Sequence, residues 1–225
     1  GRSPIIEPGL EEALRDAVST GNLVAAEHGS GNAEIFLISV GTPSNENGSL
    51  NLEYLKKVGR DIGQALKESG VPYPVVVNRS TVLPGTISSC LVPLLERTSG
   101  RKAGRDLGVC MNPEFMREGT SLEDFYHPPF TVIGADDKRS TELVERIYEK
   151  VKAPIYRTSL AVAEMLKYAC NAFHGLKVAF ANEIGNVCQA CGIDGQKVME
   201  IFCRDTKLNL SPYYLKPGFA FGGSC

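Results

Sequence analysis

The sequence lacks a long apolar run, an excess of charge of either sign, a signal peptide and internal repeats. No apolar run approaches the roughly 20 residues that a membrane-spanning helix needs without a charge. The 24 basic residues are balanced by 26 acidic ones, and the formal net charge of -2 gives no attraction to nucleic acid or to an anionic membrane. The first residues, Gly1 to Pro4, do not form a signal peptide.

The cysteines are odd in number and come without a secretion signal. Seven cysteines in a chain of 225 residues indicate reduced thiols and a cytosolic protein. We expect most of them to be small buried hydrophobic residues. Cys188 and Cys191 form a C-x-x-C pair, but no second pair has the spacing of metal ligands. We therefore expect neither a metal nor a redox site there.

The length and the hydrophobic share of 43% suit one or two globular domains with a real core. The chain does not begin with methionine, and it stops at Cys225 directly after a pair of glycines. We expect it to be an internal piece of a longer protein.

Apolar runs and helical periodicity alternate along the first two thirds of the chain. Four runs predict buried strands, at residues 33–40, 74–78, 107–111 and 130–134. Three segments predict helices, at residues 51–68, 86–95 and 140–151. This alternation predicts an α/β fold with a doubly wound parallel sheet over residues 1–158. Such a sheet binds ligands at the carboxyl ends of its strands, where the polar segments 41–43, 79–81 and 112–114 lie.

The segment Leu160–Cys191 contains no proline and has helical spacing throughout. Gly192 is expected to close this helix, and Asp194 to cap a second one. The long helix is apolar nearly all round, so it should be buried against other domains or another subunit. We therefore expect residues 159–225 to form a helical dimerisation domain.

Four polar residues follow one another at three- and four-residue steps on the long helix: Glu164, Lys167, Asn171 and His174. They share one face of the helix. A solvated stripe is one interpretation. The mixture of lysine, asparagine and histidine instead suggests buried polar groups that need partners.

Two further clusters could carry chemistry. Cys225 follows two glycines, which allow a backbone to approach a ligand closely, and a cysteine on such a loop can be a nucleophile, although most cysteines are structural. Glu114 and Glu118 lie four residues apart and could share a helical face as base and hydrogen-bond partner, or they could simply be acids at a helix start. Gly29-Ser30-Gly31 precedes a strand instead of following one, so it fails the structural test for a phosphate loop.

Together these motifs resemble the UDP-glucose and GDP-mannose dehydrogenase family. The matching pieces occur in family order across the chain: Ser3-Pro4 through Glu7-Pro8-Gly9, Val40-Gly41-Thr42-Pro43, Ser80-Thr81-Val82, Asn112-Pro113-Glu114-Phe115 through Glu118-Gly119, Lys167-x3-Asn171-Ala172-Phe173, Asn182-Glu183 and Phe221-Gly222-Gly223-Ser224-Cys225. Segments 79–86, 180–185 and 208–225, with His174, are most similar to the branch that oxidises GDP-mannose.

The resemblance implies an incomplete Rossmann-like NAD-binding domain and a set of catalytic roles. Cys225 would attack the aldehyde formed by a first hydride transfer, and a second hydride would leave the thiohemiacetal to give a thioester. Lys167 and Asn171 would stabilise the oxyanion. Thr81, Glu114 and Glu118 would position and activate the hydrolytic water.

The resemblance also implies binding residues. Contacts to NAD would come from Gly41, Thr42, Pro43, Ser80, Thr81 and Glu118. Contacts to the nucleotide sugar would come from Glu118, Lys167, Asn171, His174, Asn209, Tyr213, Tyr214, Lys216, Phe219 and Gly222. Family members most similar to this chain carry arginine at the position of Lys216, and lysine keeps the charge but lacks the bidentate fork.

Parts of the family pattern are missing, and other functions stay open. The glycine-rich dinucleotide fingerprint is expected before Gly1, and a second nucleotide-binding domain after Cys225, so we expect this stretch alone to be inactive. A UDP-sugar is the alternative substrate. A non-catalytic helical dimerisation module and a thiol acyltransferase or hydrolase that works without NAD are the alternatives from other classes.

Overall fold

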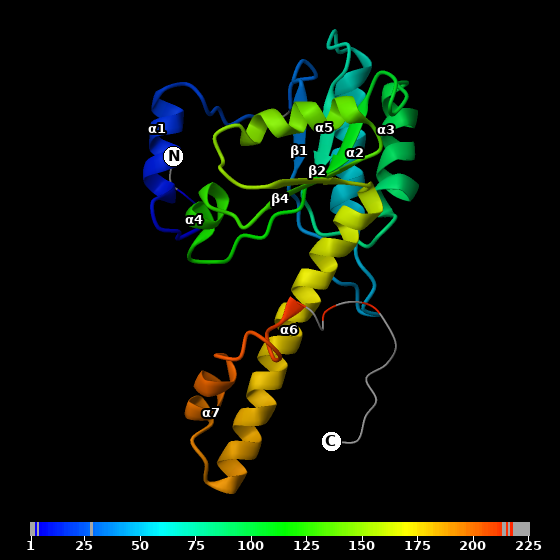
Figure 1. Ribbon diagram of the computed structural model, residues 1–225. Coiled ribbons are helices and arrows are strands. Elements are labelled where there is room, and N and C mark those ends of the chain that lie inside the picture. The colour runs from blue at the N-terminus through cyan, green and yellow to red at the C-terminus, as the bar shows by residue number, and fades with distance from the viewer. Residues whose placement is uncertain (1–2, 4, 28, 213–214, 216, 218–225) are drawn as a thin grey trace. The chain divides into compact units, whose positions relative to one another are not determined.

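The computed structural model describes residues 3, 5–27, 29–212, 215 and 217. In chain order the elements of this part are α1 (Leu10–Ser19), β1 (Ile35–Ile38), α2 (Glu53–Lys67), β2 (Val75–Asn78), η1 (Ile87–Leu91), α3 (Val92–Ser99), β3 (Gly108–Met111), α4 (Ser121–Tyr126), β4 (Thr131–Ala135), α5 (Lys138–Glu145), η2 (Arg146–Tyr148), β5 (Ile155–Thr158), α6 (Leu160–Cys191) and α7 (Gly195–Phe202) (Figure 1). The chain divides into two compact units, Gly1–Cys170 and Asn171–Cys225, and α6 runs from the first into the second. Among the described residues, no helix is long and apolar enough to cross a membrane.

The first unit contains a five-stranded sheet in the order β1-β2-β3-β4-β5. β1, β2 and β3 are parallel to one another, as are β4 and β5. The expectation of an entirely parallel sheet is wrong at one place, because β4 runs antiparallel to β3. The chain between β3 and β4 contains the short helix α4 and reverses direction, so β4 joins the sheet without the long crossover that a parallel neighbour needs. β5 was not predicted, because its exposed Tyr156 and Arg157 interrupt any apolar run.

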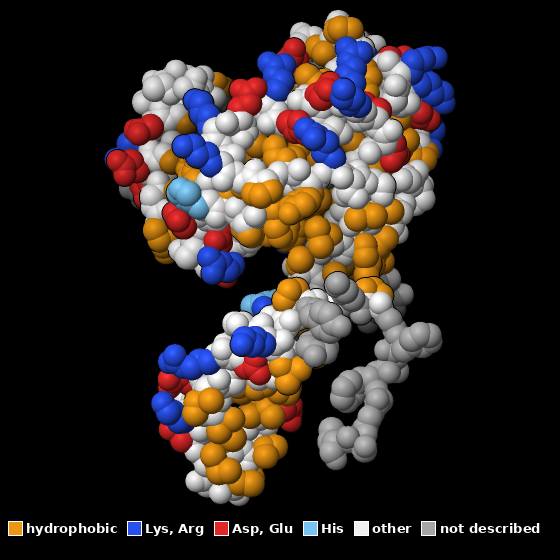
Figure 2. Space-filling view, in the orientation of Figure 1, with side chains coloured by type: hydrophobic (Ala, Val, Ile, Leu, Met, Phe, Trp, Pro, Cys, Tyr) orange, Lys and Arg blue, Asp and Glu red, His pale blue; other side chains and the backbone are white. Residues whose placement is uncertain are grey.

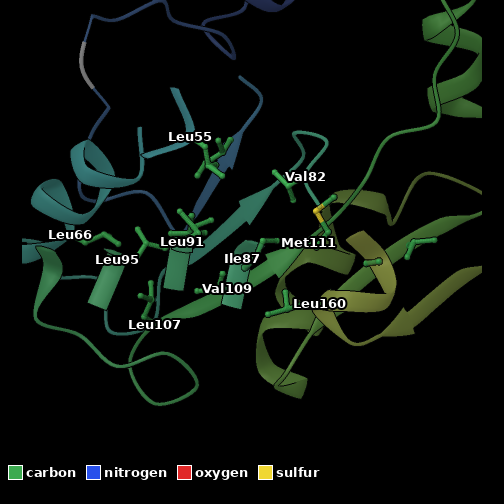
Figure 3. Packing of buried hydrophobic residues seen from close by; sticks show 14 residues of the cluster. Leu55, Leu66, Val82, Ile87, Leu91, Leu95, Leu107, Val109, Met111 and Leu160 are labelled. Atoms are coloured by element: carbon green, nitrogen blue, oxygen red, sulfur yellow. The ribbon is translucent and has the colours of Figure 1, made fainter. Parts of the chain in front are cut away.

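Helices cover both faces of the sheet, which confirms the doubly wound fold. Val76 and Val109 lie in the core cluster that contains the apolar side chains of α2 and α3. Val75 and Val77 point to the opposite face and pack in a second cluster with Val144 of α5. Alternate residues of one strand therefore serve two cores, as the pleat requires. Figure 3 shows the first cluster, in which side chains of α2, η1 and α3 meet those of the central strands and Leu160.

Local signals decide where the helices begin and end. α6 spans the predicted Leu160–Cys191, and Gly192 ends it with a left-handed φ of 68°. The Asp194 side chain caps α7 by accepting from the Lys197 backbone N–H at 3.1 Å. The predicted helix at 86–95 begins with the π-helical turn η1 and extends to Ser99. The predicted helix at 140–151 begins earlier, at Lys138, because the Asp137 side chain caps it. The helix α1 was not predicted.

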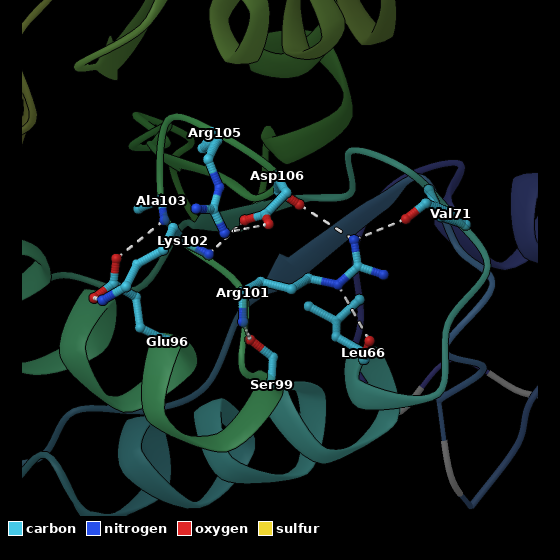
Figure 4. Close-up of polar contacts among 9 residues, drawn as sticks. All are labelled: Leu66, Val71, Glu96, Ser99, Arg101, Lys102, Ala103, Arg105 and Asp106. Carbon is cyan, nitrogen blue, oxygen red and sulfur yellow. Dashed lines mark hydrogen bonds and ion pairs between the residues drawn. The ribbon is translucent and has the colours of Figure 1, made fainter.

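One arginine joins the end of α2 to the segments that flank it. The Arg101 guanidinium donates to the carbonyl oxygens of Leu66 at 3.2 Å, Ser69 at 2.8 Å, Val71 at 2.8 Å and Asp106 at 3.2 Å. Figure 4 shows the bonds to Leu66, Val71 and Asp106. Carbonyls at a helix C-terminus have no partner within the helix. Arg101 therefore satisfies the last turn of α2 and fixes the approach to β2.

The expectation that most cysteines are buried is wrong for this chain. Of the six described cysteines, Cys110 and Cys188 are buried, and the other four are half-buried or exposed. Cys191 is the last residue of α6 and Cys203 follows α7, and both are exposed.

Candidate active site

The loops that follow β1 and β2 are joined by side-chain hydroxyls. Ser80 Oγ accepts from the Val40 N–H at 2.9 Å and lies 2.7 Å from the Val40 carbonyl oxygen, to which it donates. Thr42 Oγ1 donates to the carbonyl oxygen of Thr81 at 2.7 Å. Neighbouring parallel strands end at the same edge of a sheet, so these bonds build one continuous rim from two loops.

The exposure of this rim differs from residue to residue. Ser80 is buried and its hydroxyl is occupied by Val40. Gly41 and Pro43 are exposed, whereas Thr42 and Thr81 are half-buried. A ligand at the rim would therefore meet the backbone of the first loop and the side chain of Thr81, while Ser80 holds the two loops together.

Lys167 places a buried cation next to the end of β3. Its side chain is 9% exposed, and its Nζ donates to the Glu114 carbonyl oxygen at 2.6 Å and to Glu114 Oε1 at 2.9 Å. The ammonium also lies 5.5 Å from the centre of the Phe115 ring. Glu114 Oε2 accepts from the Met116 N–H at 2.8 Å, so both carboxylate oxygens have donors. Lys167 is thus no part of a solvated stripe.

Glu164, one turn before Lys167 on α6, is fully buried. Its Oε2 accepts from the Gly85 N–H at 2.6 Å, and its Oε1 accepts from the Ile87 N–H at 2.8 Å. Burial raises the pKa of this carboxyl, and the two backbone hydrogen bonds oppose that rise. The sequence placed Glu164 on the polar face but suggested no partner. A carboxylate within an apolar stretch of helix was the signal that it needed one.

The segment that contains Glu114 and Glu118 is not a helix, and both helical interpretations of it are wrong. Residues 112–117 have no regular secondary structure, and Glu118 lies in an exposed turn before Gly119, whose φ is +86°. Pro113 and the hydrogen bond from Met116 to the Glu114 side chain compete with helical backbone bonds there. Glu118 makes no hydrogen bond or ion pair with any described residue, so the structure joins Glu114 to Lys167 but leaves Glu118 apart.

Glu7 holds the far end of that segment. Its Oε1 accepts from the Gly119 N–H at 2.8 Å and its Oε2 from the Ser121 N–H at 3.3 Å, at the start of α4. The hydrogen bond from Gly119 lowers the pKa of the Glu7 carboxyl. The segment from Glu114 to Ser121 is therefore fixed at both ends, by Lys167 and by Glu7.

A cavity of about 410 Å³ opens beside this segment. A buried polar network forms part of its wall, in which Arg79 and the Tyr148 hydroxyl both donate to Asn112 Oδ1. Asn112 in turn donates to the Val132 carbonyl oxygen at 2.8 Å. The residues around the cavity are Arg79, Pro113, Glu114, Phe115, Met116, Arg117, Asp124, Phe125, His127, Pro128, Pro129, Phe130, Thr131 and Tyr148. In the sequence, Arg79 belongs to a polar segment after a predicted strand, but neither Arg79 nor Tyr148 carries a motif that predicts a role.

The second unit contributes fewer described candidates. Asn171 and His174 are exposed on α6 and have no hydrogen-bond partner among the described residues. Asn209 is exposed and donates to the Phe202 carbonyl oxygen at 3.3 Å. Six candidates lie outside the described residues: Tyr213, Tyr214, Lys216, Phe219, Gly222 and Cys225. Within the described part of the chain, no group of three or more His, Cys, Asp or Glu could hold a metal ion.

Two family models match the chain. Residues 1–152 match the NAD binding domain of the UDP-glucose/GDP-mannose dehydrogenase family, and residues 161–225 match the central domain of the same family. Together they cover both compact units.

Similar proteins cover the whole chain. It is 51% identical over 228 residues to a GDP-mannose 6-dehydrogenase of Pseudomonas savastanoi pv. phaseolicola, with all of this chain and 52% of that protein aligned. A crystal structure of a ternary complex of GDP-mannose dehydrogenase from Pseudomonas aeruginosa superposes with a TM-score of 0.96 at 51% identity, covering 99% of this chain and 52% of that one. A UDP-glucose dehydrogenase from Pyrobaculum islandicum superposes with a TM-score of 0.85 at 38% identity, covering 100% and 51%. The chain thus spans about half the length of these relatives, and it belongs to the UDP-glucose/GDP-mannose dehydrogenase family.

Proposed function

We propose that the complete protein is an NAD-dependent GDP-mannose 6-dehydrogenase, which oxidises the C6 hydroxymethyl group of the sugar to a carboxylate. The observation that carries this proposal is the buried ammonium of Lys167, held by Glu114 at the end of β3. Relatives named GDP-mannose 6-dehydrogenase share 51% identity with the whole chain, against 38% for a relative named UDP-glucose dehydrogenase.

The rim formed by the loops after β1 and β2 suits one part of NAD. Doubly wound sheets bind dinucleotides at the carboxyl ends of their parallel strands, and Gly41 and Pro43 leave backbone accessible there. We assign contacts to Gly41, Thr42, Pro43, Ser80, Thr81 and Glu118, with Ser80 acting through the loop geometry. When bound, NAD accepts one hydride in each of the two oxidations. Packing explains the glycine at position 31, since a Cβ there would lie 2.2 Å from the Ala65 carbonyl oxygen of α2.

Cys225 supplies the nucleophile in this mechanism. Loss of a hydride and a proton from the alcohol gives the aldehyde, and the Cys225 thiolate then forms an S–C bond to C6. Loss of a second hydride from that carbon leaves a thioester, and water cleaves the S–C bond to release the carboxylate and the thiol. Two NAD are reduced for each sugar.

Lys167 and Asn171 stabilise the negative charge on the sugar oxygen during these steps. An ammonium group has three N–H bonds, and Lys167 directs donors at two oxygens of Glu114. The remaining N–H has no acceptor among the described residues and can donate to an oxyanion, and Asn171 lies one turn further along α6. Glu114, with Thr81 and Glu118, orients the hydrolytic water and accepts its proton.

The contacts to the nucleotide sugar belong to this proposal as well. We assign them to Glu118, Lys167, Asn171, His174, Asn209, Tyr213, Tyr214, Lys216, Phe219 and Gly222. Lys216 would contact phosphate as a point charge, without the paired hydrogen bonds that an arginine makes.

The chain also carries a surface for self-association. Apolar side chains of α6 and α7 are exposed in this chain, among them Leu176 at 63%, Val187 at 59% and Ile201 at 59%. Figure 2 shows hydrophobic side chains gathered over these two helices. We assign this surface to a symmetric dimer of a cytosolic enzyme, built on a helical domain over residues 159–225 that follows the NAD-binding domain over residues 1–158.

The stoichiometry of NADH formation by the complete protein tests this function. With GDP-mannose we expect two NADH for each sugar and no released aldehyde, and little turnover of UDP-glucose. Turnover of UDP-glucose but not of GDP-mannose would show that the substrate is UDP-glucose. One NADH for each sugar, with free aldehyde, would contradict the covalent route. No NADH with either sugar would leave a helical interaction module or an NAD-independent thiol enzyme.

A further inference from the structure

Glu164 has a buried carboxylate that the mechanism above does not use. Its side chain is 0% exposed, and its two oxygens accept from the backbone N–H groups of Gly85 and Ile87 at 2.6 and 2.8 Å. A carboxylate is costly to bury unless it is hydrogen-bonded. A neutral residue would avoid that cost, so the carboxylate itself requires an explanation.

The two bonds hold the segment that follows β2. Thr81 lies in this segment, Gly85 adopts a left-handed φ of +86°, and Ile87 begins η1. Because Gly85 and Ile87 come before the first full helical turn, their N–H groups have no helical acceptor. The Glu164 side chain thus replaces the missing acceptors and holds the segment against α6.

The same face of α6 also holds the segment that follows β3. Lys167 follows Glu164 by three residues, so both side chains lie on one side of the helix. Lys167 binds Glu114, which follows β3. One helical turn therefore connects the segment after β2, through Gly85 and Ile87, to Glu114 after β3.

We propose that Glu164 is a positioning residue for the oxidation, which holds the Thr81 segment in register with Lys167 and Glu114. This inference rests on the proposed function. Because Glu164 is fully buried, it would act through the geometry of the groups that face the substrate. A purely structural cap would affect stability alone.

The variant Glu164→Gln in the complete protein separates these roles. Glutamine has nearly the same shape, but one of its two acceptors becomes a donor that faces a backbone N–H. We expect kcat to fall by about 10- to 100-fold, as small misplacements of catalytic groups do, with KM for GDP-mannose changed by less than about threefold. A wild-type kcat in this variant would overturn the proposal.

Glu96→Gln is the matched control. Glu96 on α3 also accepts a backbone N–H, from Ala103 at 3.1 Å (Figure 4), and its other partner is Lys102 Nζ at 3.2 Å, so neither contact involves a site residue. We expect it to lower the melting temperature without changing kcat. If Glu164→Gln does not fold, Glu164→Asp keeps both acceptors on a shorter side chain, and it should lower kcat several-fold at nearly constant KM. A wild-type kcat in a folded Glu164→Asp would then overturn the proposal.

Hydrogen exchange gives a readout that does not depend on turnover. The amides of Gly85 and Ile87 should exchange faster in Glu164→Gln than in the wild type, because they lose a full acceptor. Unchanged exchange would contradict the tether itself. If wild-type protein reduced no NAD, the proposed function would fail, while faster exchange in the variant would still support the tether.

Discussion

The proposed chemistry depends most on Lys167, whose ammonium group would stabilise the oxyanion. In the complete protein, Lys167→Ala should lower kcat by about 10²–10³, or roughly 3–4 kcal/mol, the usual cost of removing one donor to an oxyanion. It should also raise the pKa of the Cys225 thiol, since a nearby cation stabilises a thiolate. The measurement is the pH dependence of Cys225 alkylation in wild type and variant.

A second lysine on the same helix serves as the control. Lys177 is exposed and lies 5.0 Å from the centre of the Phe173 ring. Lys177→Ala should leave both turnover and the alkylation profile unchanged. Coincident profiles for wild type and Lys167→Ala would show that Lys167 does not lie beside the cysteine.

Cys110 on β3 should behave in the opposite way to a reactive thiol. Burial raises its pKa to about 12, with a smaller contribution from the charge of Asp137. A thiol with a raised folded-state pKa stabilises the fold below its unfolded pKa of about 9, and this stabilisation is lost as the pH rises towards 12. We expect the free energy of unfolding to fall more steeply above pH 9 for wild type than for Cys110→Ala, as measured by urea unfolding from pH 7 to 10.5. Parallel curves would contradict this.

Arg101 connects whole elements, since it holds the end of α2, the start of β2 and the turn before β3. Arg101→Ala leaves the carbonyls of Leu66, Ser69, Val71 and Asp106 without this donor. We expect a loss of about 2–4 kcal/mol in the free energy of unfolding, the scale of losing hydrogen bonds to a charged group. Arg101→Lys should recover only part of this, because lysine lacks the fork.

Arg105→Ala is the control for that measurement. Arg105 forms an exposed ion pair with Asp106 at 2.9 Å, and exposed pairs contribute about 0–1 kcal/mol. Urea unfolding should show a small change for this variant and a large one for Arg101→Ala. Equal changes would mean that the carbonyl contacts of Arg101 are not what stabilises this corner.

At the scale of the whole molecule, the exposed apolar surface of α6 and α7 predicts association. Leu176 is 63% exposed, and Leu176→Glu should place a charge in the proposed dimer interface. We expect the complete wild-type protein to be a dimer at micromolar concentration by light scattering, and the variant to shift towards monomer. Lys197→Glu changes an already exposed charged residue of α7 and should have no such effect. A monomeric wild type would contradict the assignment.

The features that the sequence alone determined are local ones. α6 could be located at both ends because an apolar helical pattern runs without interruption to Gly192, a residue that readily adopts the left-handed φ found there. Asp194 marked the next helix because its side chain caps a backbone only three residues away. The sequence also predicted that the polar residues after β1, β2 and β3 lie at one edge of the sheet, because parallel strands end at the same edge.

The tertiary structure decided the pairings between distant residues. The antiparallel direction of β4, the bonds from Glu164 to Gly85 and Ile87, and the joining of Lys167 to Glu114 link positions between 20 and 80 residues apart. Side chains in such contacts leave no periodicity along the chain, because each partner satisfies the other through space and neither alters its neighbours in sequence. The sequence therefore predicted the residue types of the site. The contacts that hold these residues in place, from Glu164 and Lys167 to the segments after β2 and β3, depend on the tertiary structure.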